Sequence, residues 1–218
     1  GAVMSTSAVE IVVFTVIVNF FMTLRGKGEM LKSNLALRWF YTGAVFYFLT
    51  CFQCAFQTTL TFQKLIHFSD WVVAHAHLVM FGVFTCWIVG MIEYLWPKLV
   101  GAEWYSKKLS AWNYWLCTGG LIVMFLDLTI VGVVQGYLWR NLAPWEQTLV
   151  VSQPFWHIRT VAGTAIIAGL MMFGYNMWMT ARQAGPRTVE GAAGGPGGKK
   201  LPGDTTEEAP AAASSSLS

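Results

Sequence analysis

Five long apolar runs limit what this chain of 218 residues can fold into. They span about Ser5 to Leu24, Trp39 to Leu60, Asp70 to Trp96, Ala111 to Val134 and Phe155 to Thr180. A run of about 20 apolar residues can cross a bilayer as a helix. Because the bilayer core offers no water to an open backbone, helix is the structure such runs adopt. With only 11% charged and 55% hydrophobic residues, the sequence predicts an all-α polytopic membrane protein with five transmembrane helices.

The composition changes sharply near residue 182. We expect a transmembrane helical domain over residues 1–182 and a disordered tail over 183–218, which is rich in Gly, Pro, Ala and Ser. The first run has no basic segment before it and no small-residue cleavage site after it, so it is expected to be a span rather than a signal peptide. Because Gly1 is an unusual first residue, we expect a fragment or a processed product.

Basic residues are distributed unequally between the two sets of loops. The loops after the first and third runs and the start of the tail hold Arg25, Lys27, Lys32, Arg38, Lys98, Lys107, Lys108, Arg182 and Arg187. The opposite loops hold Lys64 and Arg140. Positive charge favours the cytoplasmic side, which predicts an outside N-terminus and a cytoplasmic tail in a bacterial cytoplasmic membrane. The net charge of +3 therefore belongs to membrane-flanking loops and does not indicate a nucleic-acid partner.

Local signals predict where the third span begins and ends. Ser69 or Asp70 suits its N-cap, and Pro97 is expected to end it. Polar connections are expected over 61–69 and 135–153. The four cysteines, Cys51, Cys54, Cys86 and Cys117, lie inside apolar runs and are interpreted as small packing residues rather than as a zinc or c-type haem site.

Two histidines near the start of the third span are the strongest candidates for function. At about 100° per residue, His75 and His77 point about 200° apart around a helix. Such a pair cannot readily chelate one metal, but it could ligate two metals on opposite flanks. The alternative is a packing histidine bonded to a neighbouring carbonyl. All four histidines (His67, His75, His77 and His157) are expected toward the outer side of the membrane. Ionisable groups inside a membrane are functional candidates by default.

Several motifs resemble subunit I of the haem–copper oxidases. The stretch from Val72 to His77 is similar to the tenth transmembrane helix of that family. The resemblance is closest to the C-type (cbb3) branch of the family. The residues that carry it are 67–71, Tyr94 to Pro97, 104–106, Gln135 to Arg140, 158–159 and Tyr175 to Thr180. The resemblance covers about Met4 to Arg182 and implies helices eight to twelve of a twelve-helix subunit.

The resemblance implies a role for each matching residue. His75 would ligate the iron of a high-spin haem and His77 that of a low-spin haem, both of b type. His67 and Arg159 would lie near the haem propionates, although Arg159 could also snorkel to the interface. Tyr47 matches a tyrosine of a proton-uptake route, with Asn19 near it; a buried tyrosine bonded to a carbonyl is the alternative for Tyr47.

The implied function is that of a terminal respiratory oxidase, which reduces O2 to water with electrons from cytochrome c and translocates protons. The family's copper ligands lie on earlier helices, so copper and full activity would require the N-terminal half of subunit I, with cytochrome c-type subunits or another donor. Gln53 stands where the C-type branch has glutamate, and Asp127 matches no family role. The stretch 78–82 resembles nitric oxide reductases, so a reductase large subunit remains an alternative. So do a non-enzymatic haem b electron carrier and a structural membrane protein without a cofactor.

Overall fold

The computed structural model describes residues 1–184, and every regular element in that range is helical. The elements are α1 (Ala2–Leu24), α2 (Gly28–Ser33), α3 (Leu35–Gln57), α4 (Leu60–Ile66), α5 (Asp70–His77), the π-helix η1 (Leu78–Thr85), α6 (Cys86–Val100), α7 (Lys107–Arg140) and α8 (Trp145–Gln183). Five helical units are long and apolar enough to cross a membrane, which confirms the predicted fold class. Apart from Gln183 and Ala184, the expected tail lies outside the described residues.

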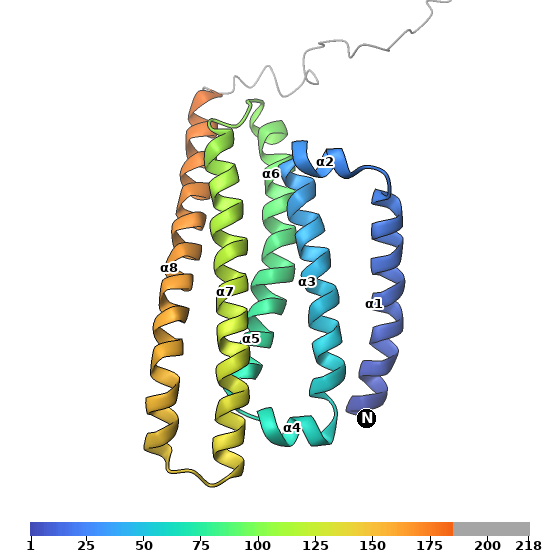
Figure 1. Ribbon diagram of the computed structural model, residues 1–218. Helices are drawn as coiled ribbons and strands as arrows, with labels where there is room; N and C mark the ends of the chain where they lie inside the picture. Colours follow the sequence, from blue (N-terminus) through green and yellow to red (C-terminus); the bar gives the residue numbers. More distant parts are fainter. Residues whose placement is uncertain (185–218) are drawn as a thin grey trace, which may run out of the picture. The chain divides into compact units, whose positions relative to one another are not determined.

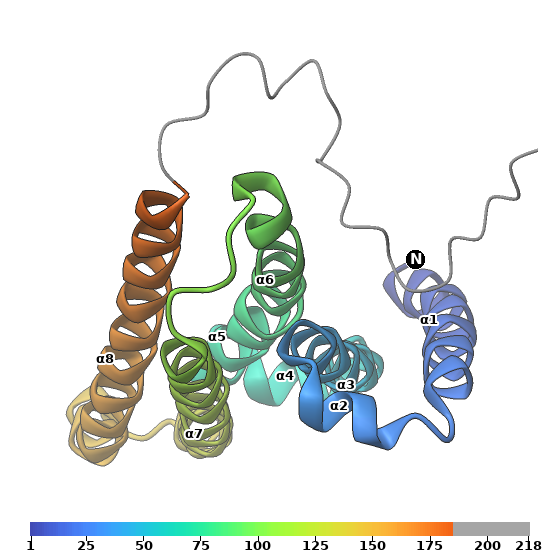
Figure 2. The same ribbon diagram turned by 90° about the horizontal axis from the view of Figure 1, so that it is seen from above.

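The long helices stand side by side in a curved row (Figures 1 and 2). In order, α1 packs on α3, α3 packs on η1 and α6, α5 packs on α7, and α7 packs on α8. The segments α5, η1 and α6 follow one another without a break and form a single span over Asp70–Val100. The short helices α2 and α4 lie at opposite ends of the long helices, and we call these the α2 end and the α4 end of the molecule (Figure 1).

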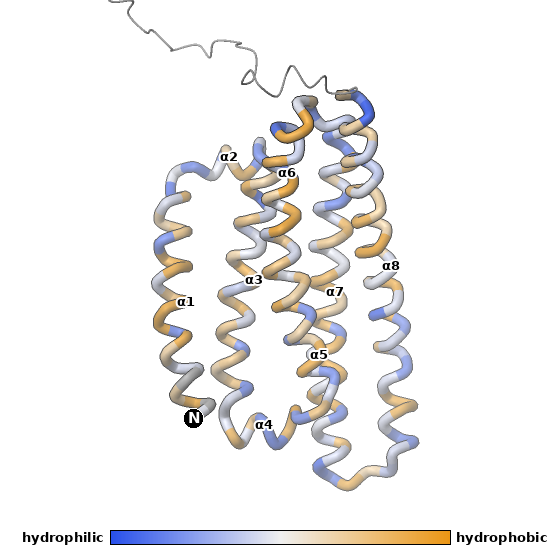
Figure 3. Tube along the Cα trace, turned by 180° about the vertical axis from the view of Figure 1, so that it is seen from behind, coloured by the Kyte–Doolittle hydropathy of each residue, from blue (hydrophilic) through white to orange (hydrophobic). Residues whose placement is uncertain are grey.

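The core lies where α3, the central span and α7 meet. Its largest fully buried side chains include Trp39, Leu78, Leu121 and Leu128. Hydrophobic residues dominate the middle of the long helices, whereas hydrophilic residues are more frequent at α4 and at the ends of α7 and α8 (Figure 3). This distribution matches helices that contact hydrocarbon at mid-length and water at their ends.

The prediction that Pro97 ends the third span is wrong. Helix α6 continues to Val100 and stops at Gly101, whose amide donates to the Pro97 carbonyl at 2.8 Å and whose left-handed φ of 76° turns the chain out of the helix. Proline lacks the N–H that would bond the Glu93 carbonyl. The indole Nε1 of Trp104 donates to that carbonyl instead, at 3.1 Å. The proline is therefore tolerated because a side chain from the next loop replaces the missing donor.

The connections between spans are also shorter in the structure than the sequence predicts. Residues 141–144 alone separate α7 from α8, in place of the connection predicted over 135–153. Helix α4 occupies most of the connection predicted over 61–69, and α2 lies in the basic loop after α1. Helix α7 has 34 residues, which at 1.5 Å per residue is about 51 Å and exceeds the hydrocarbon thickness of about 30 Å. Beyond the apolar run the two helices remain paired through polar contacts, such as Gln135 Nε2 donating to Ser152 Oγ at 3.0 Å. Apolar length alone therefore underestimates both helices.

Candidate functional site

The histidine-bearing helix α5 is held against α7 by a close backbone approach. A Cβ at Gly132 would overlap the backbone of Trp71, and a Cβ at Gly136 would overlap the Leu65 carbonyl. Glycine at both positions, one turn apart, therefore allows α7 to reach α4 and the first turn of α5. Ser69 is the N-cap of α5, as predicted, and its Oγ accepts the Trp71 amide at 3.3 Å.

A polar network anchors the start of α5 to two other helices. Asp70 receives hydrogen bonds on Oδ2 from Gln135 Nε2 at 2.8 Å and from Trp156 Nε1 at 3.1 Å. Its amide donates to Gln135 Oε1 at 2.8 Å, and Gln135 also reaches Ser152. Sequence reasoning identified Asp70 only as a possible cap. The one signal in the sequence is that no basic residue stands next to Asp70, so that its carboxylate needs hydrogen-bond donors from elsewhere in the chain.

His75 is half-buried on the side of α5 that faces α3. Its Nδ1 lies 3.2 Å from Gln53 Oε1, and its Nε2 lies 3.5 Å from Cys54 Sγ. Because an amide oxygen can only accept, Nδ1 carries the proton and Nε2 keeps its lone pair. Its ring is also parallel to that of Trp71, with the centroids 6.0 Å apart. Cys54, interpreted from sequence as a packing residue, thus contacts the nitrogen that a metal would use.

His77 has the same protonation pattern from a different partner. Its Nδ1 donates to the Val73 carbonyl of its own helix at 2.8 Å, so Nε2 again keeps its lone pair. Two residues beyond His75, it lies about 200° around the helix and so on the flank away from Gln53. The buried residues Ala74 and Leu78 lie between the two flanks.

This arrangement offers one imidazole donor on each side of one helix. Among residues 1–184, no group of three or more His, Cys, Asp or Glu side chains is close enough to hold a metal ion. A single imidazole nitrogen on each flank suits a metal that takes one protein ligand per face, as haem iron does. The second ring nitrogen is already bonded in both cases, which is the usual way in which a ligating histidine is oriented. The residues fit the groups that the sequence resemblance implies.

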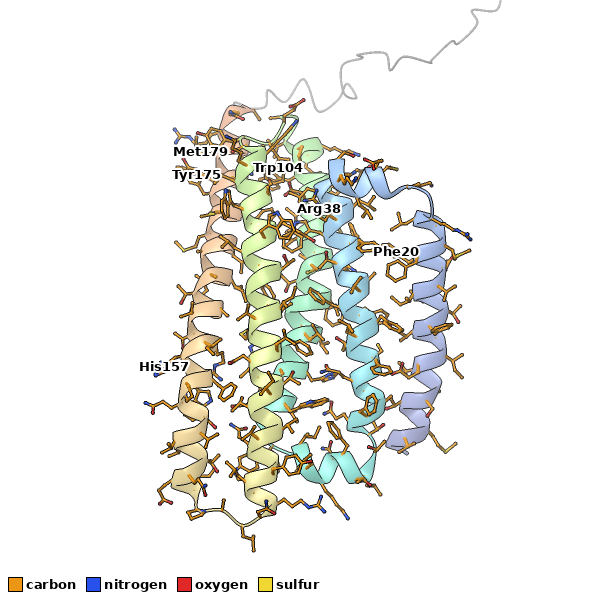
Figure 4. The ribbon with its side chains drawn as sticks, viewed as in Figure 1. Phe20, Arg38, Trp104, His157, Tyr175 and Met179 are labelled. Atoms are coloured by element: carbon orange, nitrogen blue, oxygen red, sulfur yellow. The ribbon has the colours of Figure 1, made fainter. Side chains whose placement is uncertain are left out.

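The other predicted site residues are not gathered around α5. His67, at the end of α4, is exposed and its Nδ1 accepts from Gln63 Nε2 at 2.9 Å. It lines a pocket of about 460 Å³ with Lys64, Gly136, Trp139 and Arg140. His157 lies in the half of α8 nearer the α4 end and points away from the bundle (Figure 4). All four histidines lie toward the α4 end, but only His75 and His77 share an element.

Four further residues lie on α8, α3, α7 and α1. Arg159 is half-buried on α8. Tyr47 is half-buried on α3, where its ring meets that of Trp87 edge-on at 5.6 Å and packs against a small cluster with α1. Asp127 is buried on α7, and neither carboxylate oxygen has a hydrogen-bond partner among the described groups. Asn19 lies exposed on α1.

Comparisons with known proteins match this chain to membrane oxidases. A model of the family described as cytochrome C and quinol oxidase polypeptide I matches residues 1–165. The Cbb3-type cytochrome c oxidase subunit CcoN1 of Stutzerimonas stutzeri is 28% identical over 184 residues, which cover 81% of this chain and 39% of that protein. Cytochrome c oxidase subunit 1 of Rhodobacter capsulatus is 27% identical over 180 residues, which cover 79% of this chain and 34% of that protein.

Two more comparisons extend the picture. A nitric oxide reductase subunit of Stutzerimonas stutzeri is 29% identical over 125 residues, which cover 53% of this chain and 26% of that protein. A cryo-EM structure of a heme-copper terminal oxidase dimer superposes with a TM-score of 0.58 at 18% identity, over 71% of this chain and 27% of that chain, and so shows a shared fold. The chain spans 39% or less of the length of each of these relatives.

Proposed function

The chain belongs to the cytochrome c and quinol oxidase polypeptide I family, and from this premise we propose that it forms the helix eight to twelve portion of the catalytic subunit of a C-type haem–copper oxidase. In this proposal residues 1–182 are the transmembrane domain and the remainder is a disordered tail. The observation that carries the proposal is the pair of α5 histidines, each with Nδ1 bonded and Nε2 available, on opposite flanks of one helix.

His75 is proposed as the ligand of a high-spin b-type haem and His77 as a ligand of a low-spin b-type haem. When bound, these haems carry electrons from a cytochrome c donor to the site of O2 reduction, where copper is held by residues outside this chain. Gln53 fixes the His75 ring through Nδ1. His75 Nε2, which contacts Cys54 Sγ, would be the atom that holds the iron.

Other residues of the chain serve binding and proton transfer in this proposal. Arg159 and His67 are proposed partners of haem propionates, since a guanidinium suits a carboxylate. Tyr47, half-buried between α1 and the central span, is proposed to relay protons through its hydroxyl. From the positive charge of the loops we propose that the α2 end faces the cytoplasm and the N-terminus faces outside. The N-terminal half of subunit I and cytochrome c-type subunits are the proposed partners, in a bacterial cytoplasmic membrane.

Single substitutions in the assembled enzyme test the assignment of the two histidines. His75→Ala is expected to abolish the high-spin haem signal and His77→Ala the low-spin signal, read by absorption and electron paramagnetic resonance spectra. His157→Ala is the matched control, because that side chain points away from the bundle at the same end. Loss of the same single haem in both variants, or two intact haem signals in either, would contradict the assignment.

A second candidate is the large subunit of a nitric oxide reductase. It is favoured by the 29% identity to the nitric oxide reductase relative over 125 residues and by the resemblance of residues 78–82, which form most of η1. The two activities are separated by supplying O2 or NO to the purified assembly and measuring consumption. Metal analysis gives an independent answer, because an oxidase holds copper and a reductase holds non-haem iron beside the high-spin haem.

A further inference from the structure

A pocket at the α2 end contains a buried carboxyl group that the proposed haem chemistry does not use. The pocket lies between α2, α3, α6 and α7 and has a volume of about 610 Å³. Its wall includes Lys32, Arg38, Glu93, Tyr94, Trp104 and Lys107. Figure 4 labels Arg38 and Trp104, both near this end of the bundle.

Glu93 is the buried group of this pocket. Its side chain is 7% exposed, and Oε2 has no hydrogen-bond partner among the described residues. It lies on α6 seven residues before the helix ends at Val100, which is about 10 Å further into the span. An ionised carboxylate in such a place is costly without a partner. Ionisable residues inside membranes characteristically mark ion and proton pathways.

The cations around the pocket do not pair with Glu93. Within residues 1–184, the ion pair present is that of Lys32 Nζ with Glu29, at 2.9 Å. Arg38 donates to the carbonyls of Leu31 and Lys32 at 3.1 and 2.7 Å and so holds the end of α2. The remaining charged or titratable residues of the wall are Lys107 on α7 and Tyr94 on α6. The Lys98 ammonium lies over the Tyr94 ring, 3.5 Å from the ring centre. Glu93 is thus not half of a structural salt bridge.

Two aromatic side chains with polar atoms lie beside this part of α6. One turn earlier on α6, Gly90 packs against Trp39 so closely that an added Cβ would lie 2.9 Å from the Trp39 Cβ. Trp39 Nε1 is buried without a partner among the described residues, and its ring meets that of Tyr114 at 5.0 Å. The Tyr114 hydroxyl in turn lies 2.7 Å from Thr42 Oγ1 on α3. Both rings belong to the hydrophobic core, so the Trp39 Nε1 atom and the Thr42–Tyr114 hydroxyl pair are polar groups set among apolar side chains.

We propose that Glu93 exchanges protons with water in this pocket and forms a proton inlet at the α2 end. The carboxylate takes a proton from a hydronium ion in the pocket water and returns it to another water molecule there, so that only O–H bonds form and break. The exchange at Glu93 does not depend on haem binding. Delivery of these protons to Tyr47 rests on the proposed function and is a separate question.

Chemical labelling tests whether Glu93 becomes protonated. A hydrophobic carbodiimide adds to protonated carboxyl groups within membranes. In the assembled wild-type complex, peptide mass spectrometry is expected to find the adduct on Glu93, with a yield that falls as pH rises. Glu93→Gln is expected to remove it, while Glu103→Gln, which alters an exposed carboxyl in the neighbouring loop, leaves it unchanged.

Thiol accessibility tests whether water fills the pocket. Ala111→Cys places a thiol on the pocket wall, and Ala168→Cys places one on α8 at a similar half-buried position away from it. A charged thiol reagent added from the α2 side is expected to modify Ala111→Cys many times faster than Ala168→Cys or the native cysteines. Ala36→Cys, also on the wall, replaces Ala111→Cys if that variant does not assemble.

Both results are required. A lack of adduct on Glu93 at every pH overturns the proposal, as does equal reactivity of the wall and control thiols. Haem spectra recorded on the same samples report the proposed function independently. A Glu93 adduct in material that binds no haem would retain the inlet and reject the oxidase.

Discussion

At the scale of single residues, hydrogen bonding to the second ring nitrogen decides what the two α5 histidines can do. His75 Nδ1 is bonded to a side chain of another helix, whereas His77 Nδ1 is bonded to its own backbone. A substitution of Gln53 can therefore change the hydrogen bond of His75 without changing that of His77. This difference allows the electronic properties of one proposed haem site to be changed alone.

Substitution of Gln53 is expected to affect only the haem on His75. In Gln53→Glu a carboxylate accepts from Nδ1, and this stronger, charge-assisted bond makes the imidazole more basic and lowers the midpoint potential of the high-spin haem. Gln53→Leu removes the acceptor and is expected to raise that potential and reduce activity about 10-fold or more. Redox titration of both haems in the assembled enzyme measures the effect.

The control is Gln63→Leu, which removes the partner of His67 instead. It is expected to leave the potential of the high-spin haem unchanged. Equal shifts in both haems after substitution of Gln53, or a shift confined to the low-spin haem, would argue against the separation of the two sites.

At the scale of elements, the position of α5 depends on α7 more than on its own sequence. Short and followed directly by the π-helix η1, α5 is located by the glycine contacts and by the Asp70 network. π-Helical segments are often found at functional sites, and η1 begins directly after His77. Small residues on α7 and polar residues on α8 thus determine where the imidazoles stand.

Two glycine substitutions on α7 are expected to have opposite effects. Gly132→Ala forces a methyl group into the Trp71 backbone, so it should destabilise the fold by about 1–3 kcal/mol and weaken haem retention at α5. Gly119→Ala meets no atom within 4 Å, and alanine should stabilise the helix by about 0.5–1 kcal/mol. Thermal unfolding in detergent, followed by haem absorbance, compares the two. Similar behaviour of both variants would mean that the close approach of α7 to α5 is not required.

At the scale of the whole molecule, the described part is a row of spans rather than a closed bundle. Helix α1 packs chiefly on α3, and α8 packs chiefly on α7. Many large apolar side chains on the outer helices are exposed, including Ile11 on α1 and Met171 on α8. Such surfaces suit contact with lipid or with further helices, in keeping with a chain that spans less than half of its relatives' length.

Orientation in the membrane is a prediction at this scale. Because the basic loops lie at the α2 end, a fluorescent protein fused after residue 184 is expected to fold and fluoresce in the cytoplasm. Alkaline phosphatase inserted in the connection 141–144 is expected to be active, since it requires the outside compartment. The reverse pattern of reporter activity would show that the charge bias does not set the topology.

The sequence by itself determined the number of spans, their approximate limits and the two histidines, because hydropathy and helical periodicity are local properties. Only the tertiary structure decided that Gln53 and Cys54 meet His75, that Asp70 is bonded by Gln135 and Trp156, and that Glu93 is buried beside a pocket. It also decided that Pro97 is tolerated, because Trp104 supplies the missing donor. These contacts join residues on different elements, and a linear pattern does not specify which helix faces bring them together.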